Sequence, residues 1–255
     1  MSLPVRIALA ALRRPERHAY GGDASQVADL HLPAGHGPHP VVVVLHGGHW
    51  RTGFGKLVTR PIAVDLARRG RAAWNLEYRR LGRGGGWPMT FEDVGTGIDH
   101  LATLADPRLD LTRVTLLGHS AGGHLALWAA GRGTSPPYAV GSSPRVLPTR
   151  VAALAPVTDL ASAGRAAREL VGGSLDERPE RWAQVDPARR PPPPMPTLVV
   201  HGEADQTIDV ERSRRYVARC SAQGGDTRLL VPPGEGHRDP IDPSSGSWAA
   251  VLAWL

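Results

Sequence analysis

Cysteine, lysine and long apolar runs are all scarce in this sequence of 255 residues. The single cysteine, Cys220, excludes an internal disulfide as well as a zinc ribbon or an iron–sulfur site, which need several thiolates. Uninterrupted apolar runs such as Val41–Leu45 are far shorter than the roughly 20 residues that a membrane-spanning helix needs. The first twenty residues resemble a secretory signal only loosely, because Arg13, Arg14 and Arg17 follow the short apolar stretch instead of preceding it. We therefore expect a cytoplasmic protein without membrane association.

Lysine occurs once, at Lys56, so 29 of the 30 basic residues are arginines. The formal net charge is +6, and glycine (30) and proline (24) are also abundant, which indicates a compositional bias of the source genome. The arginines are scattered singly or in pairs, without the interleaved aromatic residues that would stack on bases. We therefore expect no nucleic-acid partner.

Short β-branched runs alternate with segments of helical periodicity along most of the chain. Strands are predicted over 26–32, 41–45, 72–78, 114–117, 151–155, 197–200 and 227–231, and helices over 56–70, 90–105, 121–130, 210–222 and 247–255. Thr90 and Asp93 resemble a capping box at the start of the second helix. This alternation is typical of a mostly parallel sheet covered by helices on both faces, and it indicates an α/β fold with a single domain over 1–255.

Two stretches interrupt the alternation. Residues 132–148, rich in Gly, Ser and Pro, are interpreted as a surface connection. Residues 160–196 form either a surface connection or a small partial cap that shapes a pocket, and the sequence leaves both open.

The strongest chemical signal is the pentapeptide Gly118-His119-Ser120-Ala121-Gly122, which lies between a predicted strand and a predicted helix. This context is the one that a nucleophile elbow requires. The turn would hold Ser120 in a strained backbone conformation, and side chains at the two glycines would collide with the neighbouring strand and helix. Ser120 is therefore the predicted nucleophile.

A serine hydroxyl needs a general base to become nucleophilic at neutral pH. Three histidines follow Ser120 in the sequence. His124 is one helical turn away and is expected to pack or cap, and His201 is interpreted as a strand-end residue that points away from the site. His237 lies in a turn-rich segment after the last predicted strand, where a loop can carry it over the serine, so it is the predicted base.

The acid that orients the base is expected after the preceding strand, since the chain order in this fold type is Ser, acid, His. Asp205 lies just past the end of the 197–200 strand and is the predicted acid. Glu203 falls earlier in the turn, and Asp209 is placed as the N-cap of the following helix.

The segment His46-Gly47-Gly48-His49-Trp50 directly follows the buried 41–45 strand. Its backbone amides, together with that of Ala121, can converge on a carbonyl oxygen that becomes an oxyanion. A zinc site at His46 and His49 lacks a third ligand at a suitable spacing.

These motifs, with His201-Gly202-Glu203-Ala204-Asp205 and Gly236-His237, resemble the α/β-hydrolase superfamily and, within it, the HGGxW group of small carboxylesterases and kynurenine formamidase-like enzymes. The resemblance implies a catalytic triad of Ser120, Asp205 and His237, an oxyanion hole from the Gly48, His49 and Ala121 amides, and no metal or organic cofactor. The His49 ring either faces solvent or meets the substrate. Trp50 and His119 are the candidates for substrate binding.

The expected function is hydrolysis of a small carboxylic ester through an acyl-enzyme. Two alternatives stay open: an arylformamidase that cleaves N-formylkynurenine, and a hydrolase-like protein that binds a ligand without catalysis. The partner is expected to be a small-molecule ester or amide, and the sequence leaves monomer and homodimer open.

Overall fold

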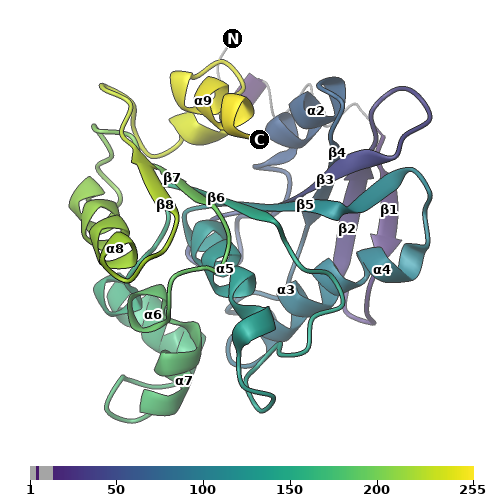
Figure 1. The fold of residues 1–255 in the computed structure, drawn as a ribbon. Coiled ribbons are helices and arrows are strands. Elements are labelled where there is room, and N and C mark those ends of the chain that lie inside the picture. The colour runs from purple at the N-terminus through teal and green to yellow at the C-terminus, as the bar shows by residue number, and fades with distance from the viewer. Residues whose placement is uncertain (1–3, 6–13) are drawn as a thin grey trace.

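One twisted sheet forms the centre of the computed structural model, which describes residues 4, 5 and 14–255 (Figure 1). The interpretation of the N-terminal segment therefore lies partly outside the described residues. Within these residues, the sheet has eight strands in the order β1-β2-β4-β3-β5-β6-β7-β8. The strands are β1 (Glu16–Ala19), β2 (Val27–His31), β3 (His39–Leu45), β4 (Ala72–Leu76), β5 (Leu109–His119), β6 (Arg150–Leu154), β7 (Thr197–Val200) and β8 (Thr227–Leu230).

Six of these strands, β4-β3-β5-β6-β7-β8, run parallel, whereas β1 and β2 pair antiparallel at one edge. The predicted mostly parallel sheet is thus confirmed, and the strand predicted over 26–32 is present as the antiparallel β2. The register of β3 on β5 pairs Leu45 with Gly118. Because both chains continue in the same direction, Gly47 and Ser120 leave the sheet side by side at the carboxyl ends of these strands, where ligands bind in open α/β sheets.

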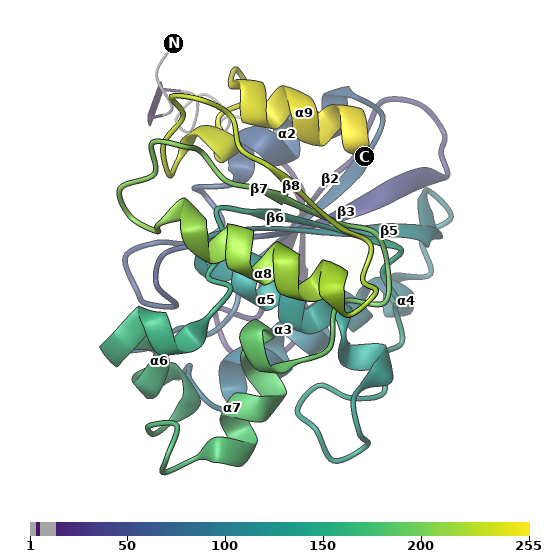
Figure 2. The same ribbon diagram turned by 60° about the vertical axis from the view of Figure 1, so that its left-hand side comes forward.

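Helices cover both faces of the sheet (Figures 1 and 2). Two of them, α2 and α9, lie on one face, and the others lie on the opposite face, with α6 and α7 farthest from the sheet. The helices are α2 (Arg60–Arg68), α3 (Met89–Asp99), α4 (Leu101–Leu104), α5 (Ala121–Ala130), α6 (Gly164–Val171), α7 (Pro179–Val185), α8 (Val210–Ala222) and α9 (Gly246–Trp254), with short 3-10 turns at Arg132–Thr134, Leu160–Ala163, Pro187–Arg189 and Asp239–Ile241. Among the described residues, no helix combines the length and apolarity needed to cross a membrane.

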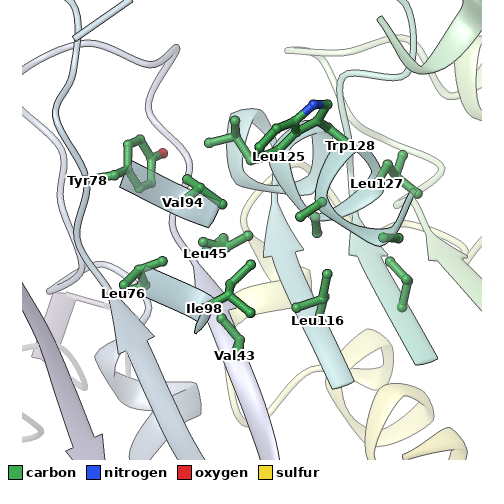
Figure 3. Close-up of a cluster of buried hydrophobic side chains, with 14 of the residues drawn as sticks. Val43, Leu45, Leu76, Tyr78, Val94, Ile98, Leu116, Leu125, Leu127 and Trp128 are labelled. Atoms are coloured by element: carbon green, nitrogen blue, oxygen red, sulfur yellow. The ribbon is translucent and has the colours of Figure 1, made fainter. Parts of the chain in front are cut away.

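The sheet separates two apolar cores. The larger core packs Val43, Leu45 and Leu116 of the strands against α3 and α5 (Figure 3). The smaller core packs Val42 and Val44 against α2 and α9. Alternate residues of β3 therefore point to opposite cores, which is why this strand is apolar throughout.

Several predicted boundaries differ from the structure. The predicted 56–70 helix begins only at Arg60, followed by Pro61 in its first turn. The predicted capping box is wrong, because the helix begins at Met89 after Pro88. Thr90 instead accepts a hydrogen bond from the Gly86 N–H (2.9 Å) and donates one to the Arg79 carbonyl (2.8 Å). Strand β1 is not predicted at all, because its four residues are mostly exposed and polar.

Residues 160–196 form a largely helical connection between β6 and β7 that contains α6 and α7. Leu170, Trp182 and Val185 are buried in the larger core. The Trp182 indole N–H donates a hydrogen bond to the Gly173 carbonyl (3.1 Å), and the His124 ring on α5 bonds the Val185 carbonyl (2.9 Å). This stretch is therefore an integral part of the helical layer beneath α5.

Candidate active site

Ser120 joins β5 to α5 in a backbone conformation with φ 55° and ψ −117°. A non-glycine residue at positive φ costs on the order of 1–3 kcal/mol and persists only where its surroundings hold it there. A Cβ added at Gly118 would lie 2.1 Å from the Gly122 carbonyl oxygen, and one at Gly122 would lie 2.2 Å from the Leu45 carbonyl oxygen. The predicted strain at the serine and the predicted collisions at both glycines are confirmed.

His237 lies on the loop after β8, and its ring faces Ser120. Its Nε2 atom is 3.1 Å from Ser120 Oγ, and its Nδ1 atom is 2.7 Å from Asp205 Oδ2. Three residues from three separate loops are thus brought together in the order nucleophile, base and acid. This is the contact pattern in which the base can take the serine proton while the acid holds the opposite ring nitrogen.

The side chain of Asp205 is fully buried, and hydrogen-bond donors surround both of its oxygens. Besides His237, the Oδ2 atom meets Nε2 of His201 at 3.1 Å. The Oδ1 atom accepts the backbone N–H groups of Thr207 (2.7 Å) and Ile208 (3.0 Å). Burial alone raises the pKa of the Asp205 carboxyl, but these hydrogen bonds outweigh it and hold that pKa far below its ordinary value. Asp205 is therefore a carboxylate at neutral pH.

His201 is not the outward-pointing residue that its place at the end of a strand predicts. Its ring is buried, with Nδ1 2.8 Å from the Ser213 hydroxyl and Nε2 2.9 Å from the Ile208 carbonyl. Because the Ile208 carbonyl and Asp205 carboxylate both accept, the ring proton lies on Nε2 and supports the acid. The spacing of four residues between His201 and Asp205 is the sequence signal for this contact.

The loop after β3 approaches the serine closely. A Cβ added at Gly47 would lie 3.0 Å from the Ser120 Cβ. Three successive residues of this loop, Gly48, His49 and Trp50, have positive φ angles of 112°, 54° and 56°. Among the described residues, the backbone N–H groups of Gly48, His49 and Ala121 have no hydrogen-bond partner. These three donors are the ones that the resemblance to α/β-hydrolases implies for an oxyanion hole.

A cavity of about 710 Å³ opens at Ser120. Its lining includes the polar residues Ser120, His119 and His237, the apolar residues Phe54, Val58 and Ile241, and the charged residues Arg238, Asp239 and Asp242. This size lies within the range of small-molecule pockets.

Some of the remaining predicted site residues line the cavity and others do not. Gly48 and His49 line it, and the His49 side chain is exposed there. Trp50 does not line it, so its assignment to substrate binding is wrong. The indole is 1% exposed and packs edge-on against His124, with ring centres 5.3 Å apart. No described residue of 160–196 lines this cavity either.

His119 lines the cavity but also holds the base in place. Its Nε2 atom is 2.8 Å from the His237 carbonyl oxygen, which makes Nε2–H the donor. Burial, with a smaller effect from the neighbouring His237, lowers the pKa of His119 to about 3. The ring is therefore neutral at physiological pH and adds no charge beside the base.

The chain is similar to several known proteins. The model of the BD-FAE protein family matches residues 28–219. Esterase LipC of Mycobacterium tuberculosis is 29% identical over 240 residues, which cover 87% of this chain and 59% of that protein. The chain thus spans less than two-thirds of the length of this relative.

Two solved structures share the fold. An esterase of the planctomycete Thermogutta terrifontis with bound butyrate superposes with a TM-score of 0.75 at 21% identity, covering 94% of this chain and 91% of that one. A truncated carbohydrate esterase from gut microbiota gives a TM-score of 0.80 at 19% identity, with 93% of both chains covered. At such identities the similarity shows the fold, and it confirms the predicted α/β-hydrolase class.

Proposed function

The chain belongs to the BD-FAE family, and from this premise we propose that it is a serine esterase that hydrolyses small carboxylic esters through an acyl-enzyme. The observation that carries the proposal is the continuous chain of contacts from Ser120 Oγ through His237 to Asp205, at 3.1 and 2.7 Å. Ser120 and His237 line a cavity of about 710 Å³, a volume large enough for a small ester.

In the first half of the reaction, Ser120 Oγ attacks the ester carbonyl carbon while His237 Nε2 accepts the hydroxyl proton. Asp205 keeps the other ring proton on Nδ1, so that Nε2 carries the lone pair that the base needs, and it stabilises the imidazolium that forms. The negative charge on the substrate oxygen is taken up by the N–H groups of Gly48, His49 and Ala121. His237 then gives its proton to the leaving alcohol.

In the second half, water enters the place of the alcohol. His237 accepts one of its protons, and the resulting hydroxide attacks the acyl carbon. Collapse of the second oxyanion intermediate returns the proton to Ser120 and releases the carboxylic acid.

The proposed substrate class is based on the residues that line the cavity. Phe54, Val58 and Ile241 offer an apolar wall to an acyl or alkyl group, and the T. terrifontis esterase of the same fold is known with bound butyrate. We therefore propose short acyl chains as the preferred substrates.

The test compares wild type with Ser120→Ala on a p-nitrophenyl ester series from acetate to decanoate, and on N-formyl-L-kynurenine. Ser221→Ala on the exposed side of α8 is the matched control. We expect Ser120→Ala to lose at least about 10⁴-fold in kcat, since the nucleophile is removed. Labelling of Ser120 by a fluorophosphonate separates catalysis from ligand binding alone. A formamide kcat/KM above that of every ester would refute the ester assignment.

A further inference from the structure

We propose that Phe54 ends the acyl pocket and thereby limits the length of the acyl chain that the enzyme accepts. This inference rests on the proposed esterase function. It concerns the segment that follows the loop after β3, where the wall of the active-site cavity is also the wall of a second cavity.

The second cavity has a volume of about 420 Å³ and adjoins the active-site cavity. Gly53, Phe54 and Val58 line both cavities, whereas Leu57 lines the second cavity and not the first. The other residues that line the second cavity are Arg17, Gly55, Lys56, Glu77 and Arg80. Phe54 has the largest of the shared side chains, so its ring is the main barrier between the two cavities.

The position of Phe54 relative to the base assigns it to the acyl side of the ester. The alcohol takes its proton from His237 Nε2, so the alcohol group lies on the side of the loop after β8. Phe54 lies on the opposite side of Ser120, since its segment follows β3 and is bound to the end of β4, and the sheet order places β5 between β3 and β8. The acyl chain leaves the carbonyl carbon in the direction away from the alcohol and therefore extends toward Phe54.

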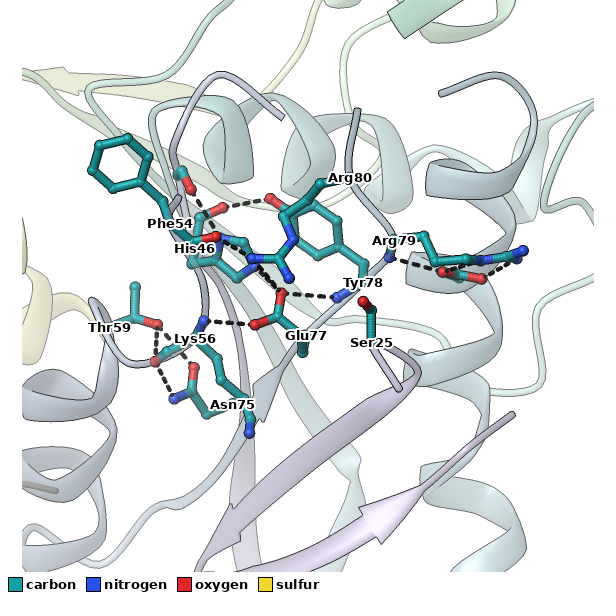
Figure 4. Close-up of polar contacts among 12 residues, drawn as sticks. Ser25, His46, Phe54, Lys56, Thr59, Asn75, Glu77, Tyr78, Arg79 and Arg80 are labelled. Carbon is teal, nitrogen blue, oxygen red and sulfur yellow. Dashed lines mark hydrogen bonds and ion pairs between the residues drawn. The ribbon is translucent and has the colours of Figure 1, made fainter. Parts of the chain in front are cut away.

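The backbone around Phe54 is bound to a buried polar cluster at the end of β4 (Figure 4). The Phe54 carbonyl accepts a hydrogen bond from Arg80 Nη1. The Lys56 N–H donates to Glu77 Oε2 at 3.1 Å, and the Lys56 carbonyl accepts from Asn75 Nδ2 at 2.8 Å. Figure 4 shows the Phe54 ring pointing away from this cluster. The ring therefore projects from a fixed backbone.

Phe54 also packs on the loop that carries two of the oxyanion donors. A Cβ added at Gly48 would lie 2.4 Å from the Phe54 Cβ. Because the Gly48 N–H is one of the donors to the substrate oxygen in the proposed mechanism, the Phe54 side chain begins directly beside the place of the ester carbonyl. An acyl chain that starts at this carbonyl meets the Phe54 ring within a few carbon atoms.

Removal of the ring should join the two cavities. Each buried methylene group contributes about 4-fold to kcat/KM, and in wild type this gain ends where the chain meets Phe54. In Phe54→Ala the chain can continue past Val58 to Leu57. We therefore expect the kcat/KM ratio of octanoate to butyrate to rise at least about 10-fold, which requires burial of about two of the four added methylene groups.

The first test measures kcat/KM on p-nitrophenyl esters from acetate to decanoate. Leu57→Asp is the matched control, because Leu57 lies on the same segment, is 50% exposed and does not line the active-site cavity. Its acyl-length profile should equal that of wild type. In Phe54→Ala/Leu57→Asp the gain for octanoate should disappear, because the new carboxylate would lie beside the alkyl chain in the second cavity.

Two results of this assay would overturn the proposal. One is an unchanged octanoate-to-butyrate ratio in Phe54→Ala, and the other is a gain that persists in the double variant. Phe54→Leu should give a ratio between those of wild type and Phe54→Ala, and it decides the question if the alanine variant does not fold.

A binding measurement separates the role of Phe54 from the esterase function. Calorimetry gives the Kd of butyrate and of octanoate for Ser120→Ala and for Ser120→Ala/Phe54→Ala. Loss of the ring should tighten octanoate binding at least about 10-fold relative to butyrate. This readout needs no turnover, so a wild-type protein that hydrolyses no ester would refute the esterase function alone. Octanoate binding that is no tighter in the double variant would overturn the assignment of Phe54.

Discussion

Replacing Asp205 by asparagine changes one oxygen for an NH2 group at a site where all four neighbours are donors. Two of them, the backbone N–H groups of Thr207 and Ile208, cannot change. The amide oxygen must therefore face these two, and the NH2 group must face His237 and His201. The ring of His237 then accepts at Nδ1 and carries its proton on Nε2, where it points at Ser120 and cannot act as a base.

The size of the effect follows from these contacts. A base held in the wrong tautomer loses about 10⁴-fold in kcat in a serine triad. Hydrogen bonds to a charged group contribute about 1.5–3 kcal/mol each, and the substitution weakens at least one such bond to a histidine. We expect a loss of about 2–4 kcal/mol in the free energy of unfolding, which for a chain of this size corresponds to about 5–15 °C in Tm.

The assay compares kcat on a p-nitrophenyl ester and the Tm of wild type and Asp205→Asn. Glu203→Gln and Asp209→Asn are the controls, since both make the same chemical change on the same loop. Asp209 caps α8 by accepting the Glu211 N–H at 2.9 Å, a role that asparagine also fills. Both controls should retain kcat. More than a tenth of wild-type kcat in Asp205→Asn would refute the assignment of Asp205 as the orienting acid.

Two further predictions concern stability. Gly122→Ala should prevent normal folding or lower Tm strongly, because the added Cβ would lie 2.2 Å from the Leu45 carbonyl oxygen, and this clash outweighs the preference of about 1 kcal/mol that alanine has for helices. Gly22→Ala is the control and should leave Tm unchanged, because its Cβ would meet nothing within 4 Å. Thermal unfolding measures both variants, and equal Tm values would contradict this prediction. Burial lowers the pKa of His124 to about 4, so its neutral form contributes fully to stability above the ordinary pKa of about 6.5 and progressively less as the pH falls toward 4. Between pH 7 and 5, urea unfolding of wild type should lose about 2 kcal/mol more than His124→Leu, and an equal loss in both proteins would contradict this prediction.

Local sequence signals located the nucleophile and several elements well. Helix α5 begins and ends at the predicted residues, because Gly118 and Gly122 allow the close backbone approach that the sharp turn needs and the run from Ala121 to Ala130 favours a helix. Strand β7 and helix α8 also have the predicted bounds. These elements depend on periodicity and capping within a few residues, which a single sequence records directly.

Contacts between segments that are distant in the sequence could not be predicted from such local signals. Trp50 follows the predicted oxyanion loop in sequence, yet its positive φ turns the indole into the core against His124. The sequence leaves the 160–196 stretch open between a surface connection and a cap, and the structure buries its Leu170, Trp182 and Val185 in the larger core. In both cases the position was decided by which apolar surface the side chains could reach, and the sequence order does not contain that information.

The sequence by itself determined the chemistry: the residue types of nucleophile, base and acid, their order, and the glycines that allow close approach. The tertiary structure alone decided that His119 supports the base, since the His119 ring meets the His237 carbonyl across strand ends that only the sheet brings together. The physical reason is that a hydrogen bond depends on separation in space, and parallel strands place residues more than a hundred positions apart within 3.1 Å of one another, as with Ser120 and His237.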